Sequence, residues 1–384
     1  GLGDVYKRQD THRLSMELET LSLTNFKNIA SAELEFSPRV NCLVGNNGQG
    51  KSNLLDAIHY LSLCRSFTGV GDGLLTRRGE DFAMARATYM RRGVAEELTL
   101  GFQRGRRRSF KRGGKEYKRI REHIGLFPLV MTSPSDIDLI RGPGEGRRRW
   151  MDMVISQGDA AYLDALMRYN SALEQRNRLL RDHVVDHTLY EFVEMTLDAS
   201  AEVITTARRR WTERLQTLFS RYYSAVAGDG EQPSIGYATT LTSDAPRLSE
   251  QLDSARRHDE IVGHTSVGPH RDDIDLSLDG MPMRRTGSQG QSKTFTVALR
   301  LGQWQFLSEV TGLKPMLLLD DIFDKLDARR VERIMSLVGD GSFGQIFITD
   351  TNRTHLDEII DRTEGDSGSH RLWSVEEGRF TRER

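Results

Sequence analysis

The residues with the clearest chemistry stand at positions 45–52, where glycines precede a lysine and a serine. They match the phosphate-binding pattern G-x-x-x-x-G-K-[ST] at every fixed position. In such a turn, backbone N–H groups point at an anion, the lysine reaches the terminal phosphates of a nucleotide, and the hydroxyl binds Mg²⁺. The segment consists of Gly45, Asn46, Asn47, Gly48, Gln49, Gly50, Lys51 and Ser52.

The flanks of this turn support the same interpretation. Residues 40–44 are an apolar run that predicts a buried strand, and residues 53–61 have the apolar spacing of a helix. A helix that starts at the turn adds the positive end of its dipole to the anion site. We therefore expect this segment to bind a nucleoside triphosphate, and a glycine-rich turn without a ligand is the alternative.

Two acids follow a second apolar run. Residues 316–319 predict another buried strand, and Asp320 and Asp321 stand at its end. In P-loop proteins, an aspartate in this position helps to hold Mg²⁺ beside the phosphates. We predict that Ser52 and Asp320 form the metal site and that Asp321 orients and deprotonates the attacking water. Lys51, Asp320 and Asp321 are thus the predicted catalytic residues, although paired acids at a strand end can also cap a helix.

A third segment, Ser288-Gln289-Gly290, precedes a helix expected at about residues 292–310. Serine and glycine at the start of a helix offer a second anion site, but such loops often only cap the helix. The order of the motifs is more specific. A P-loop, a long insert, this loop, a short helix and a strand with two acids resemble the layout of ABC-type ATPases, in which the loop serves the nucleotide bound by the other subunit.

The remaining pattern predicts an α/β protein whose nucleotide-binding head is split by a compact, mainly helical insert. Alternating apolar residues predict strands within residues 18–36 and 83–103, and again from Ile274. Between residues 150 and 260, apolar residues recur at intervals of three and four, as in Trp211, Leu215 and Leu218, and predict long packed helices. We assign residues 16–150 and 261–384 to the head and 151–260 to the helical lobe. Residues 1–15, before Met16, are interpreted as a non-native or unstructured leader.

Charge is unevenly distributed, although the net charge is only −1. Residues 104–121 carry many arginines and lysines against a single acid, Glu116, and the glycines at 113 and 114 predict a hairpin turn within them. Cys42 and Cys64 stand in apolar segments and fit a reducing compartment. The sequence has no apolar run long enough to span a membrane, and we expect a cytoplasmic protein.

From Met16 to its C-terminus, the chain resembles the bacterial RecF family of DNA replication and repair proteins. Besides the P-loop and the Ser288 loop, the resemblance rests on the segments 23–28, 133–136, 147–152, 169–180 and 268–273. The hexapeptide Gly-Pro-His-Arg-Asp-Asp at 268–273 and the segment Gln175-Arg176-Asn177 are together its most specific parts.

This resemblance implies a homodimer that closes on two ATP molecules with Mg²⁺. Each ATP would contact Lys51 and Ser52 of one subunit and the loop at 288–290 of the other. Asp136 would lie in a segment that couples the nucleotide to the helical lobe, and Asp350 is our candidate for the position of the usual switch histidine. Asp321 is one methylene shorter than the glutamate that is usual in ABC-type ATPases, so we expect slow hydrolysis.

The resemblance also implies binding to DNA, especially at gaps and at junctions of double and single strands, and cooperation with RecO and RecR in loading recombinase. The basic stretch could supply phosphate contacts. The candidates are Arg106, Arg107, Arg108, Lys111, Arg112 and Lys115. A solvated hairpin tip without a ligand is the alternative, since charge runs often only solvate a surface.

Two other functions compete with a DNA-binding ATPase. A nuclease fused to an ATPase head would need a further acidic domain of about a hundred residues, and only a short segment follows Asp350 in this sequence. An interaction scaffold would bind ATP without hydrolysing it, and the presence of both Asp320 and Asp321 argues against that function.

Overall fold

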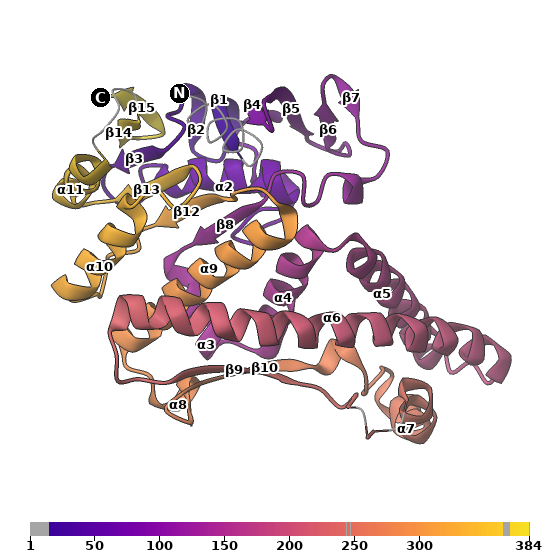
Figure 1. Ribbon diagram of the computed structural model, residues 1–384. Coiled ribbons are helices and arrows are strands. Elements are labelled where there is room, and N and C mark those ends of the chain that lie inside the picture. The colour runs from indigo at the N-terminus through magenta and orange to yellow at the C-terminus, as the bar shows by residue number, and fades with distance from the viewer. Residues whose placement is uncertain (1–14, 243, 246, 364–368, 384) are drawn as a thin grey trace, which may run out of the picture. The chain divides into compact units, whose positions relative to one another are not determined.

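The computed structural model describes residues 15–242, 244, 245, 247–363 and 369–383, and Figure 1 shows its helices and strands. The chain forms two compact units. The first combines residues up to Asp136 with residues 225–227 and residues from Gln289 onward, and the second comprises residues 137–224 and 228–288. Of the leader predicted at residues 1–15, only Ser15 lies within the described residues.

A largely parallel sheet forms the centre of the first unit. Its strand order is β15-β14-β3-β13-β12-β8, and every neighbouring pair is parallel except β14 and β15. Every residue of β12 and β13 is buried, which explains why their sequences are continuous apolar runs. The strands are β3 (Val40–Val44), β8 (Leu129–Thr132), β12 (Met316–Asp320), β13 (Ile346–Asp350), β14 (His370–Glu376) and β15 (Arg379–Arg382).

An antiparallel sheet with the order β2-β1-β4-β5-β6-β7 forms the other part of the first unit. Buried and accessible residues alternate along β4, as expected for a sheet with one covered face. The helix α2 (Lys51–Leu63) contacts β4 of this sheet and β8, β12 and β13 of the parallel sheet, so it packs between them (Figure 1). The strands are β1 (Met16–Phe26), β2 (Ile29–Glu35), β4 (Phe82–Arg91), β5 (Val94–Gln103), β6 (Ser109–Arg112) and β7 (Lys115–Glu116).

Three further helices complete the first unit. The helix α9 (Gln289–Thr311) packs on β8, and α11 (Arg353–Thr363) packs on β3 and β13. The helix α10 (Ala328–Gly339) packs on α11 and begins after Asp327, whose side chain accepts a hydrogen bond from the backbone N–H of Arg330 at 3.0 Å. Asp327 is therefore an N-cap residue.

The second unit is mainly helical. It contains α3 (Ile137–Arg141), α4 (Gly144–Gly158), α5 (Ala160–Arg181), most of α6 (His187–Ala227), α7 (Leu248–Val262) and α8 (Met283–Thr286). A three-stranded sheet accompanies these helices, with the order β11 (Met281–Pro282), β10 (Asp273–Leu278) and β9 (Pro233–Ala238). None of the helices in the described part of the chain is long and apolar enough to cross a membrane.

The sequence predicted the helical stripes correctly, since Trp211, Leu215 and Leu218 are all buried on α6. It placed the lobe at residues 151–260, and the compact unit extends beyond both limits. The strand that begins near Ile274 was expected in the head. It lies instead in the second unit, because β10 pairs along its whole length with β9.

Buried arginines hold the second unit together. The side chain of Arg176 is fully buried and donates to Glu194 at 2.8 Å and to the equally buried Asp259 at 2.7 Å. Burial of an ion pair stabilises only when both partners stay matched, because an unpaired buried charge is costly. Because Glu194 and Asp259 both pair with it, Arg176 can be buried on a helix whose other buried residues are aromatic or apolar.

The hexapeptide at 268–273 belongs to the same network. His270 shares a hydrogen bond with the hydroxyl of Tyr169 at 2.7 Å, and Arg208 donates to Asp272 at 3.1 Å. Arg147 donates to Asp273 at 2.7 Å. Through these contacts the segment is connected to α4, α5 and α6, which carry Arg147, Tyr169 and Arg208.

We predict that Arg176→Leu lowers the free energy of unfolding by roughly 3–5 kcal/mol, because it leaves the buried Asp259 without its partner. Urea unfolding followed by circular dichroism measures this change. Arg178→Leu, at an exposed position of the same helix, is the control and is expected to change stability little. Equal stability of the two variants would contradict the prediction.

Candidate functional site

The parallel sheet brings the sequence motifs together. The P-loop follows β3, the paired acids end β12, and Asp350 ends β13. These strands are parallel and adjacent, with β13 between β3 and β12, so their carboxyl ends lie at one edge of the sheet. Ligands of open α/β sheets bind at this edge.

Two glycines give the P-loop its shape. Gly50 has a φ of 119°, a conformation that side chains disfavour, and it immediately precedes the first residue of α2. At Gly45, a Cβ atom would come within 2.3 Å of the carbonyl oxygen of Val375 on β14. Glycine is therefore required at position 45 because β14 leaves no space for a side chain. At position 50 it is required because of the backbone conformation at the start of the helix.

The P-loop is also held from both sides. The side chain of Asn28 donates to the carbonyl of Gln49 at 3.2 Å and accepts from Asn53 at 2.8 Å. The backbone N–H groups of Glu377 and Gly378, in the β14–β15 turn, donate to the side chain and backbone of Gln49 at 2.6 and 2.7 Å. Such fixed backbone is suited to binding phosphate without large rearrangement.

Lys51 lies within the curve of the P-loop. Its Nζ donates to the carbonyl of Asn46 at 3.0 Å and also to that of Gly45. Burial lowers the pKa of this ammonium, while Asp320, Asp321 and Asp350 oppose the change. Lys51 is thus a buried cation that contacts two loop carbonyls, with three carboxylates near enough to affect its pKa.

The side chains of Ser52 and Asp320, the predicted metal ligands, are in contact. The Ser52 hydroxyl donates to Oδ1 of Asp320 at 2.9 Å, and the Thr349 hydroxyl donates to the same oxygen at 2.6 Å. Mg²⁺ prefers hard oxygen ligands and usually takes only one or two from the protein when phosphates supply others. This pair of oxygens fits that ion.

At Asp321 the backbone leaves the extended conformation of β12, which ends at Asp320. Its φ of 49° is left-handed, and its backbone N–H donates to the carbonyl and hydroxyl of Thr349 at 3.2 and 3.1 Å. Burial raises the pKa of its carboxyl, and Asp350 and Asp324 raise it further. A carboxyl with a raised pKa next to a phosphate site is a better proton acceptor than an ordinary aspartate.

The structure adds a histidine that the sequence analysis missed. Asp350 is buried and contacts Nδ1 of His355 at 2.7 Å, while its other carboxylate oxygen accepts from the backbone N–H of Asn352 at 2.9 Å. His355 stands on α11, one turn after the strand end. The five-residue separation from Asp350 is the only sequence signal that could have indicated the pair.

Asp136 is buried in the segment after β8 and binds an arginine that was not predicted. Arg300 on α9 donates to both oxygens of Asp136, at 3.0 and 2.7 Å. This bidentate pair connects α9 to the loop after β8. Asp136 is therefore fixed within the first unit.

The segment Ser288-Gln289-Gly290 is divided by the structure. The helix α9 already begins at Gln289, several residues before the start expected from sequence, so Gln289 and Gly290 lie in its first turn. Ser288 is the last residue of the second unit. The early start places backbone N–H groups of the helix next to the serine in sequence, as an anion site at a helix N-terminus requires.

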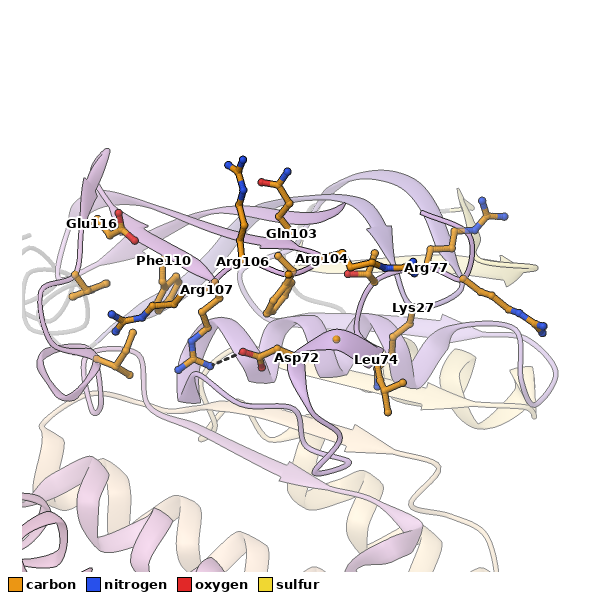
Figure 2. Close-up of a pocket in the computed structure, with 18 of the residues that line it drawn as sticks. Lys27, Asp72, Leu74, Arg77, Gln103, Arg104, Arg106, Arg107, Phe110 and Glu116 are labelled. Atoms are coloured by element: carbon orange, nitrogen blue, oxygen red, sulfur yellow. Dashed lines mark hydrogen bonds and ion pairs between the residues drawn. The ribbon is translucent and has the colours of Figure 1, made fainter. Parts of the chain in front are cut away.

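A basic cavity is the second notable feature of the first unit. Its volume is about 1570 Å³, and Figure 2 shows Lys27, Arg77, Arg104, Arg106 and Arg107 around it. The acids in its lining are Asp72 and Glu116. Its basic lining residues are Lys27, Arg77, Arg78, Arg104, Arg106, Arg107, Arg108 and Lys118. The sequence analysis missed Lys27, Arg77 and Arg78, because they belong to other segments.

The six predicted DNA contacts fall into two groups. Arg108 is half-buried and donates to the carbonyl of Cys64 at 2.8 Å and to Asp72 at 3.5 Å. Arg112 pairs with Glu96 at 2.5 Å on the neighbouring strand. These two arginines are tied to the protein. The exposed group comprises Arg106, Arg107, Lys111 and Lys115, and the last two lie on the predicted hairpin, where β6 pairs with β7.

Comparison with known proteins identifies related chains. Residues 17–70 match the model of the RecF/RecN/SMC N terminal domain. The DNA replication and repair protein RecF of Parabacteroides distasonis is 47% identical over 345 residues, which cover 90% of this chain and 94% of that protein. The RecF of Porphyromonas gingivalis strain W83 is 45% identical over 366 residues, or 95% of this chain and 100% of that protein.

Solved structures of related proteins have a similar fold. A structure described as the recombination mediator protein RecF with ATP in the RecFOR pathway matches with a TM-score of 0.85 at 29% identity, covering 97% of this chain and 99% of that one. The Smc head domain of Pyrococcus furiosus, bound to the C-terminal domain of ScpA, matches with a TM-score of 0.56 at 16% identity, covering 96% of each chain, which shows a common fold. The fold is thus that of a P-loop ATPase head with a helical insert, and the chain belongs to the RecF family of DNA replication and repair proteins.

Proposed function

We propose that this protein is an ATP-dependent DNA-binding clamp of recombinational repair and replication restart. The observation that carries the proposal is the convergence of Lys51, the Ser52–Asp320 pair and Asp321 at one edge of the parallel sheet. The same compact unit contains the basic cavity. ATP binding and DNA binding would thus be functions of one compact unit.

In this proposal, the P-loop N–H groups and Lys51 hold the phosphates of ATP. Lys51 would exchange the carbonyls of Gly45 and Asn46 for phosphate oxygens. Ser52 and Asp320 would hold Mg²⁺, which supplies positive charge to the phosphates. Asp321 would orient the attacking water and accept its proton, and its short side chain favours slow turnover.

The γ-phosphate would also bring two subunits together. Ser288, Gln289 and Gly290 of one subunit would contact the ATP held by the P-loop of the other. Two features support this assignment: the position of Gln289 and Gly290 in the first turn of α9, and the family to which the chain belongs. The closed homodimer would release DNA after hydrolysis, so that ATP acts as a timing device.

DNA would lie against the basic cavity. Within the described part of the chain, Arg104, Arg106 and Arg107 are exposed and form no ion pair with an acid, so their charges are available to phosphates. Of the aromatic lining residues, Phe102 and Phe110 are buried, and the partly exposed Tyr117 packs its ring against Phe110 and His123. We therefore infer contacts to the backbone of duplex DNA at gaps and junctions, where RecO and RecR would join to load recombinase.

We predict that Asp321→Asn lowers the turnover number for ATP by roughly 10²–10⁴-fold, because it removes a general base, and leaves ATP affinity nearly unchanged. Lys51→Ala should abolish ATP binding itself. Phosphate release and the fluorescence of a labelled ATP analogue measure the two effects. Asp361→Asn, at an exposed position of α11, is the control. Undiminished hydrolysis by Asp321→Asn would refute the role of this residue.

We predict that the double variant Arg106→Glu/Arg107→Glu weakens DNA binding and spares ATP binding, because it removes two phosphate contacts. Fluorescence anisotropy of a gapped duplex at several salt concentrations should show a slope of log K against log salt that is smaller by about 2. Arg168→Glu/Arg178→Glu, on the exposed face of α5, changes the net charge equally and serves as the control. If both double variants behave alike, the cavity is only a solvated surface.

A further inference from the structure

The first turns of α9 carry a lysine whose amine reaches the catalytic edge of the sheet. Nζ of Lys293 donates to the backbone carbonyl of Asp321 at 3.2 Å, within one compact unit. We call Ser288-Gln289-Gly290 the signature loop and α9, which begins at Gln289, the signature helix. Lys293 stands on this helix, three residues after Gly290. In the proposed dimer, the start of α9 would contact the ATP of the other subunit. Lys293, on the same helix, contacts the acid proposed to activate water.

This contact completes the support of a strained turn. The left-handed backbone of Asp321 is held on its N–H side by Thr349, through the carbonyl and the hydroxyl. On its carbonyl side it is held by Lys293. Non-glycine residues adopt this conformation only where neighbouring groups enforce it. Loss of the Lys293 contact would leave the direction of the Asp321 side chain fixed from one side only.

A second cation fixes the same helix. Arg300 lies two turns after Lys293 and binds Asp136 with two hydrogen bonds. Residues seven apart share one face of a helix, so Lys293 and Arg300 face the ends of neighbouring strands β12 and β8 together. The helix is therefore attached at two points to the loops that follow these strands.

Carboxylates surround the Lys293 ammonium, although burial lowers its pKa. Asp136 after β8, and Asp320, Asp321 and Asp324 at the end of β12, oppose this lowering. Asp320 and Asp321 also raise the pKa of Lys51 against the effect of its burial. An apolar side chain of the same length would leave this group of carboxylates with one cation fewer.

We propose that Lys293 is a positioning residue for ATP hydrolysis, which ties the signature helix to Asp321 of its own chain. The inference rests on the proposed function of Asp321. Among the described residues, Lys293 donates to the backbone carbonyl of Asp321, and it would act on the reaction through this contact. When the signature loop of one subunit contacts the ATP of the other, the signature helix would thereby affect the position of Asp321 in its own subunit.

The first test compares the full-length wild type with Lys293→Met, Lys293→Arg and a control, Lys314→Met, which lies before the opposite end of β12. ATP hydrolysis is measured over a range of ATP concentrations, and binding of a fluorescent ATP analogue is measured separately. We expect Lys293→Met to lower kcat roughly ten- to hundredfold, as misplacement of a reacting group does, with KM and nucleotide affinity changed less than about twofold. Lys293→Arg, which keeps the donor, should restore most of kcat.

Several outcomes would overturn the inference. Unchanged kcat in Lys293→Met would do so, and so would an equal loss in Lys293→Arg and Lys293→Met, which would indicate packing alone. A lowered thermal midpoint together with weakened ATP binding would also indicate a structural role. If the wild type hydrolyses no more ATP than Lys51→Ala, the proposed function itself fails, and this result is distinct from all of the others.

Mixed dimers locate the effect. A Ser288→Arg subunit combined with a Lys51→Ala subunit retains one composite site, built from the P-loop and Asp321 of the first and the signature loop of the second. We expect Lys293→Met to reduce hydrolysis at least tenfold more when placed in the Ser288→Arg subunit than when placed in the Lys51→Ala subunit. The reverse order would show that Lys293 only shapes the signature loop and would refute the inference.

Discussion

Parallel pairing of four strands is the constraint on which the site depends. Hydrogen bonds between β3, β13, β12 and β8 align their carboxyl ends, and each of these ends is followed by a segment with a different chemical task. The order of the strands in space differs from their order in the chain. A shift of one residue between β12 and β13 would separate Asp320 from Thr349, which are partners both in the sheet and through their side chains. The register between these two strands therefore also determines the geometry of the proposed metal site.

Electrostatic repulsion is the second constraint at this edge. Asp320, Asp321 and Asp350 stand close enough to influence one another, and burial deprives Asp321 of much of its solvation. The protein opposes this repulsion with Lys51 on one side and Lys293 on the other. A triphosphate would add further negative charge, so a divalent cation beside Asp320 is physically consistent with the arrangement.

The sequence allowed the parts of the site to be predicted wherever a short pattern carries its own geometry. The P-loop from Gly45 to Ser52 and the strand ending in Asp320 are such patterns, since an apolar strand followed by glycines or acids has few alternative structures. Residues joined only by tertiary folding could not be predicted. Arg300 and Asp136 are far apart in the chain, and Arg77 reaches the basic cavity from a different segment than Arg106.

Single-sequence reasoning also treats all charges of one run as equivalent. Arg108 and Arg112 lie in the predicted basic stretch, yet Arg108 forms an ion pair with Asp72 and Arg112 forms one with Glu96. The limits of the helical lobe failed for a related reason. Nothing within residues 273–278 reveals that their partner is β9 rather than a strand of the head, because strand pairing depends on which strand is near in space.

The position of β3 in the middle of the parallel sheet has a consequence for folding during synthesis. β3 is made early, but its two neighbours in the sheet, β13 and β14, are more than 300 residues further along the chain. Until a ribosome has delivered them, both edges of β3 are unpaired and its apolar side chains lack cover. Such long-range pairing slows folding and exposes strand edges to association with other chains. The nascent protein would therefore depend on chaperones, or on early folding of the antiparallel sheet around α2, to keep β3 available for its late partners.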